Sequence, residues 1–106
     1  MKQEKQLFCD VVRFLEEHLE RNVTAQELAQ QFCVSKSTLF RSFRTCTGMG
    51  VHRYIMKRKI EKATQMLREG STVAQTAERL GFGTPAYFSA RYKLETGRNP
   101  SEVIRM

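Results

Sequence analysis

Apolar residues recur every three or four positions along most of the chain, which is the period of an amphipathic α-helix. The first such segment covers residues 5–20, where charged residues separate the apolar ones. Its apolar stripe consists of Phe8, Val11, Val12, Leu15 and Leu19. The pattern predicts a first helix that supports the fold with one face and meets water with the other.

Two shorter helices are expected next. Thr24 with Glu27 three positions later has the capping-box arrangement of a helix start, and this helix can run only to about Phe32. Ser35 then opens another helix, which Gly48 ends. Two helices separated by a turn of about three residues are typical of a helix-turn-helix.

A longer helix is expected between Gly50 and Gly70, since the segment contains no proline and no internal glycine. It carries two apolar rows, which predict a helix packed on two sides. The rows are Met56, Ile60, Ala63 and Leu67, and Val51 with Ile55. At 1.5 Å per residue, some twenty residues span about 30 Å.

The pattern of the first helix-turn-helix then returns after 48 to 49 residues. Thr72 aligns with Thr24, Ala77 with Ala29 and, after one extra turn residue, Thr84 with Ser35. Further on, Phe88 aligns with Leu39, Tyr92 with Phe43, and Gly97 with Gly48. Asn99 and Pro100 begin a short final helix that should end near Arg105.

These elements predict an all-α fold of about seven helices. Two helix-turn-helix subdomains, residues 1–49 and 71–106, would be joined by a long linker helix over residues 50–70.

Charge indicates the class of partner. Eighteen Lys and Arg against eleven Asp and Glu give a net charge of +7. Residues 1–31 hold four basic and six acidic side chains, whereas residues 32–106 hold fourteen basic and five acidic side chains. An anionic partner should therefore dock on the later part of the chain.

Other classes of function find little support. No Ser/His/Asp, paired-carboxylate or glycine-rich phosphate motif appears, so we expect neither an enzyme nor a cofactor. The cysteines have no zinc or disulfide spacing, and Cys33 and Cys46 are expected to be small buried residues. His18 and His52 lack nearby ligands, so no metal site is expected. Without a membrane span or signal peptide, the protein should be cytoplasmic.

The two units, the basic helix between them and the segment Ala77–Ser101 resemble the DNA-binding domain of the AraC/XylS family of bacterial transcription regulators. The most specific matches are Gly81-Phe82, Tyr87-Phe88-Ser89, Lys93, Thr96-Gly97 and Pro100-Ser101. The resemblance runs from about Val11 to Arg105. It implies a regulator, commonly an activator, that binds double-stranded DNA and recruits RNA polymerase.

The resemblance also implies which residues meet base edges in the major groove. In the first unit they are Ser37, Thr38, Phe40 and Arg41, and in the second Ala86, Ser89 and Ala90. Arg41 is the main candidate, because a guanidinium pairs bidentately with guanine O6 and N7. Phe40 either touches a thymine methyl or packs. Ala90 departs from the family, many of whose members have arginine there.

Phosphates would be held by cations and by helix starts. The candidates are Ser35, Lys36, Arg44, Lys57, Arg58, Thr84, Arg91 and Lys93. The second unit would then contact mainly phosphates, and the selection of a DNA sequence would depend on the first unit.

Each assignment has an ordinary structural alternative. Arg41 could be a solvated surface arginine, Ser37 and Thr38 could reflect the usual polarity of a helix start, and Lys57 to Lys59 could form only a solvated face.

Two readings of function remain from the sequence. The first is a sequence-specific regulator that reads two adjacent major-groove segments, bound as a monomer to an asymmetric site because no spare apolar face is obvious. The second is a protein-interaction module that binds polymerase or another regulator and reads DNA weakly; Ala90 is the feature that favours it.

Overall fold

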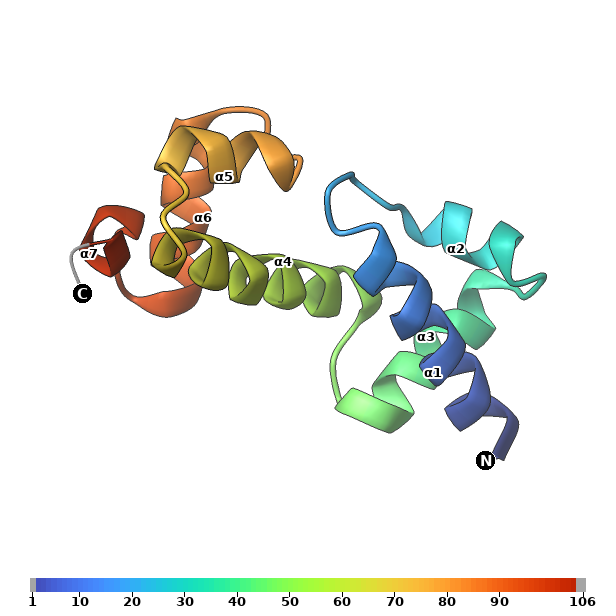
Figure 1. Ribbon diagram of the computed structural model, residues 1–106. Helices are drawn as coiled ribbons and strands as arrows, with labels where there is room; N and C mark the ends of the chain where they lie inside the picture. The colour runs from blue at the N-terminus through green and yellow to red at the C-terminus, as the bar shows by residue number, and fades with distance from the viewer. Residues whose placement is uncertain (1, 105–106) are drawn as a thin grey trace. The chain divides into compact units, whose positions relative to one another are not determined.

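Residues 2–104 are described by a computed structural model, and they form seven α-helices with no strand among them (Figure 1). The helices are α1 (Lys2–Glu17), α2 (Ala25–Gln31), α3 (Lys36–Thr47), α4 (Val51–Arg68), α5 (Val73–Arg79), α6 (Pro85–Thr96) and α7 (Pro100–Ile104). The all-α fold expected from the sequence is confirmed.

The chain forms two compact units that divide inside α4. The first unit extends to Met56 and the second starts at Lys57. Each unit therefore contains one helix-turn-helix and one part of α4, so that the long helix belongs to both.

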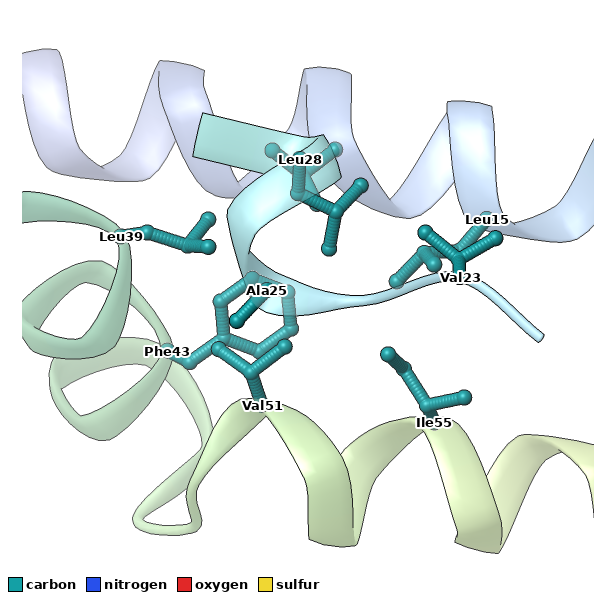
Figure 2. Close-up of a cluster of buried hydrophobic side chains, with 9 residues drawn as sticks. Leu15, Val23, Ala25, Leu28, Leu39, Phe43, Val51 and Ile55 are labelled. Carbon is teal, nitrogen blue, oxygen red and sulfur yellow. The ribbon is translucent and has the colours of Figure 1, made fainter. Parts of the chain in front are cut away.

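The core of the first unit collects apolar side chains from four helices (Figure 2). Leu15 comes from α1, Leu28 from α2 and Phe43 from α3, while Val51 and Ile55 come from the start of α4. Each of these side chains is at most 8% exposed. Burial of this kind contributes roughly 25 cal/mol per Å² of apolar surface.

The second unit is built on the later part of α4. Ile60, Ala63 and Leu67 are buried there, as are Phe88 and Tyr92 of α6. The Tyr92 hydroxyl lies 2.6 Å from Thr64 Oγ1 of α4, so the buried phenol keeps a polar partner. Both apolar rows that the sequence placed on this helix thus supply buried residues.

The helix-turn-helix turns have the same hydrogen bonds in both units. Val34 N donates to Ala29 O at 3.0 Å, and Phe82 N donates to Ala77 O at 3.0 Å. With the bonds of the preceding residue, each turn is a Schellman motif. Its left-handed position is Gly81 at φ 77° in the second unit but Cys33 at φ 56° in the first. A side chain at such a position costs about 1–2 kcal/mol, which the surrounding fold must offset.

The ends of α3 and α6 repeat as well. Gly48 and Gly97 are left-handed C-caps at φ 77° and 80°. The hydroxyls of Thr47 and Thr96 each bond the carbonyl four residues earlier, at 2.7 and 2.8 Å. The internal repeat read from the sequence is therefore present in the backbone.

Some helix limits differ from the prediction. The first helix covers Lys2–Glu17 rather than residues 5–20. His18 N bonds Leu15 O at 3.0 Å, so the helix tightens and ends there, yet Leu19 stays buried in the turn that follows. The apolar stripe therefore continues past the helix. The last helix ends at Ile104, and its expected end near Arg105 lies outside the described residues.

The expected burial of Cys33 and Cys46 is wrong, since both are exposed, as is Cys9. Cys46 lies off the row formed by Leu39, Phe43 and Thr47, and Cys33 occupies the exposed turn. Leu94 was also not identified from the sequence as an exposed apolar residue, although it is 72% exposed.

Lys59 was expected on the basic surface of the long helix, but only 4% of it is exposed. Its Nζ donates to Leu80 O at 2.7 Å and lies 5.8 Å from the centroid of the Phe82 ring. Leu80 is the C-cap of α5, so the ammonium satisfies a carbonyl at the end of that helix. Lys59 thereby ties α4 to the turn before α6.

Burial lowers the pKa of Lys59 below the ordinary value of a lysine. Between the lowered pKa and about pH 10.4, the unfolded chain binds more protons than the folded chain. The free energy of unfolding contributed by Lys59 should therefore rise with pH in that window.

We expect Lys59→Met to destabilise the protein by about 1–3 kcal/mol at pH 8, because Leu80 O loses its donor. The deficit relative to the parent protein should grow between pH 8 and 10, as measured by urea unfolding. Lys62→Met, a change at an exposed position of the same helix, is the control and should show no such trend. A Lys59→Met profile parallel to that of the parent would contradict the assignment.

Candidate nucleic-acid interface

The start of α3 is fixed by Ser35, whose Oγ accepts a hydrogen bond from Thr38 N at 3.1 Å. Leu39 and Phe43 bury the inner side of the helix. Because residues on one helix face recur every three or four positions, Ser37, Phe40 and Arg41 point outward, whereas Ser42 is buried on the inner side with these anchors.

The base-contact candidates of the first unit lie on this outer side. Ser37 and Arg41 are exposed, Phe40 is 39% exposed, and Thr38 is half-buried. The Arg41 side chain itself is 61% exposed. The structure thus brings together on one exposed face a cation, an aromatic ring and the Ser37 hydroxyl, while the Thr38 hydroxyl accepts from Ser35 Oγ at 2.9 Å.

A contact from α1 holds the Arg41 guanidinium. Arg41 Nε lies 3.5 Å from Glu4 Oε1. The neighbouring Ser42 is fully buried and its Oγ donates to Glu4 O at 2.7 Å. The main chain of Glu4 is therefore fixed against α3, which places its carboxylate beside the exposed arginine.

The phosphate candidates on α3 are available to a partner, and so is one of the two on α4. Lys36 and Arg44 are exposed on α3, and Ser35 is exposed while its hydroxyl caps the helix. On α4, Lys57 is exposed, whereas Arg58 is half-buried and paired with Glu61.

In the second unit the same framework carries different chemistry. Thr84 Oγ1 accepts from Tyr87 N at 3.1 Å, and Pro85 opens α6. Phe88 and Tyr92 bury its inner side. Ala86 and Ala90 are exposed, while Ser89 is half-buried. The outer side of α6 thus presents methyl groups where α3 presents Ser37 and Arg41.

The two cations of α6 differ. Arg91 Nη2 donates to Glu95 Oε1 at 2.8 Å, and Arg91 Nε is buried without a hydrogen-bond partner. Lys93 is exposed. Of these two phosphate candidates, Lys93 is the more exposed, since the Arg91 side chain is 29% exposed and paired with Glu95.

Sequence reasoning missed two parts of this surface. Glu4 is 37 residues from Arg41, and no local pattern connects them. Tyr87 is 51% exposed beside Ala86 and Ala90, although it was noted only for its match to the family. The Arg91–Glu95 pair had a readable signal, because opposite charges four residues apart meet on a helix.

Among the described residues, no group of three or more His, Cys, Asp and Glu side chains is placed to hold a metal ion. No described helix is long and apolar enough to cross a membrane.

Comparison with known proteins gives a family match over most of the chain. Residues 28–106 match a family described as a helix-turn-helix domain. The transcriptional activator RhaS of Salmonella schwarzengrund is 32% identical over 94 residues, which cover 88% of this chain and 34% of that protein. The chain thus spans about a third of that relative.

Solved structures share the fold. A transcriptional regulator from Chromobacterium violaceum, described as AraC-type, has a TM-score of 0.90 and 21% identity, covering 99% of this chain and 95% of that one. The DNA-binding domain of AdpA, solved in complex with a target DNA, has a TM-score of 0.84 and 24% identity, covering 92% and 88%. The arrangement of seven helices is therefore one that known DNA-binding domains adopt.

Proposed function

We propose that this chain, which belongs to the AraC/XylS family of DNA-binding transcription regulators, reads two adjacent major-groove segments with α3 and α6. The observation that supports this most is the outer side of α3, where Ser37 and Arg41 are exposed beside Lys36 and Arg44. The AdpA domain, which has the same fold, was solved bound to DNA.

In the first unit, Arg41 is the residue that selects a base. A guanidinium offers five donors in a rigid fork, and the Glu4 contact is at Nε. The two terminal nitrogens can then approach guanine O6 and N7 end-on. Ser37 and Thr38 lie one turn earlier and can bond neighbouring base edges, while Phe40 can meet a thymine methyl.

Phosphates are held on either side of this contact. Lys36 and Arg44 flank the reading face of α3, and the N-cap at Ser35 leaves backbone amides at the helix start. Lys57 adds an exposed cation on α4 and Lys93 one on α6. Arg58 and Arg91 contribute less, since Glu61 and Glu95 already pair with them.

The two units would occupy neighbouring groove segments on one duplex. Successive major-groove segments on one face are about 34 Å apart. An α4 of 18 residues spans about 27 Å. The length of α4 is therefore compatible with one unit in each segment.

We expect Arg41→Ala to lose about 1–3 kcal/mol of discrimination, or roughly 5- to 150-fold, at one guanine position of a selected site. Glu4→Gln keeps the arginine but removes its carboxylate partner. This variant should bind all duplexes more tightly, because a negative charge is lost, while discriminating less at the same guanine.

Gel-shift titration against single-base variants of the site and scrambled DNA measures both effects. Arg13→Ala, which removes an exposed arginine from α1, is the charge-matched control and should leave discrimination intact. Unchanged discrimination in Arg41→Ala would remove that residue from base reading.

We further propose that the protein activates transcription from the cytoplasm, bound to the nucleoid as a monomer on an asymmetric site and recruiting RNA polymerase. The support is that RhaS, about a third of which aligns with this chain, is named an activator. A selected site placed upstream of a weak promoter should raise reporter output when the protein is expressed. Lower output with the protein present would instead identify a repressor.

A further inference from the structure

We infer that α6 recognises thymine through its C5-methyl group, with Ala86 and Ala90 as the contacting side chains. This rests on the proposed function, in which α6 enters a major groove. It deepens that proposal by naming the base feature that the second unit selects.

The geometry of α6 places the two alanines together. Ala86 and Ala90 are four residues apart, so they lie one above the other on one face of the helix. Both are exposed, and they fall in the first half of α6, the part of a recognition helix that meets base edges. The pair forms a small apolar strip on that face.

Base chemistry limits what such a strip can select. Guanine, cytosine and adenine present only hydrogen-bonding groups in the major groove, whereas thymine adds a methyl group. An alanine pressed on a G·C edge would leave polar base atoms without water or a partner, which is unfavourable. Against a thymine methyl, the same alanine removes apolar surface from water on both sides.

Two of the polar side chains near the strip, Thr84 and Arg91, are engaged within the protein. Thr84 Oγ1 accepts from Tyr87 N, and Arg91 Nη2 donates to Glu95. Ser89 is half-buried. The Tyr87 ring packs near Phe82, with ring centroids 6.1 Å apart. Methyl contact is then the main source of selectivity on this face.

The experiment replaces thymine by deoxyuridine, which differs only in lacking the methyl group. In a site obtained by selection, each contacted thymine in the half bound by the second unit should weaken binding about fourfold when substituted, the effect of one buried methylene-sized group. The same substitution in the flanking duplex should have no effect.

Protein variants assign the effect to the alanines. In Ala90→Gly the protein methyl is gone, so deoxyuridine at the matching position should no longer weaken binding. Ala74→Gly, at an exposed position of α5, is the matched control for the helix cost of glycine and should keep the full deoxyuridine effect. Thermal melting of both variants confirms that they fold.

The outcomes separate this inference from the function on which it rests. Specific binding that is insensitive to deoxyuridine throughout the second half would overturn methyl reading alone. A deoxyuridine effect that persists unchanged in Ala90→Gly and in Ala86→Gly would also overturn the assignment. Absence of any preference for a selected site over scrambled DNA would overturn the proposed function, and methyl reading with it.

Discussion

Both hydrophobic cores depend on one helix. Val51 and Ile55 at the start of α4 complete the core of the first unit, and Ile60, Ala63 and Leu67 are buried in the second. Units of about fifty residues bury too little apolar surface to be robust by themselves. The side chains that α4 supplies to each unit are therefore a condition of both helix-turn-helix structures, and with them of the surfaces of α3 and α6.

The repeat separates framework from function. The Schellman turns, the Ser35 and Thr84 caps and the left-handed glycines after α3 and α6 use the same bonds in both units. The outward residues do not repeat, since Ser37 and Arg41 correspond to Ala86 and Ala90. One backbone thus presents two different chemistries, which suits a regulator whose site has unequal halves.

Local signals made most of the fold predictable from the sequence. Caps such as Thr72 and Thr84 and C-terminal glycines act within one helical turn, so their positions can be read directly. Residues whose role depends on distant partners could not be placed. Lys59 is buried because Leu80 O, 21 residues later, needs a donor, and Glu4 meets Arg41 because Ser42 fixes the Glu4 main chain. The candidate site residues on α3 came from the resemblance to the family, and the buried row of Leu39 and Phe43 accounts for the exposure of Ser37 and Arg41 opposite it.

The proposed mode of binding requires both units to contact one duplex in neighbouring groove segments, which phosphate-ethylation interference on a selected site can measure. Ethylation should block binding at two clusters of phosphates, on one face of the duplex and about one helical turn apart. A single cluster, as expected if only the first unit contacts DNA, would contradict it.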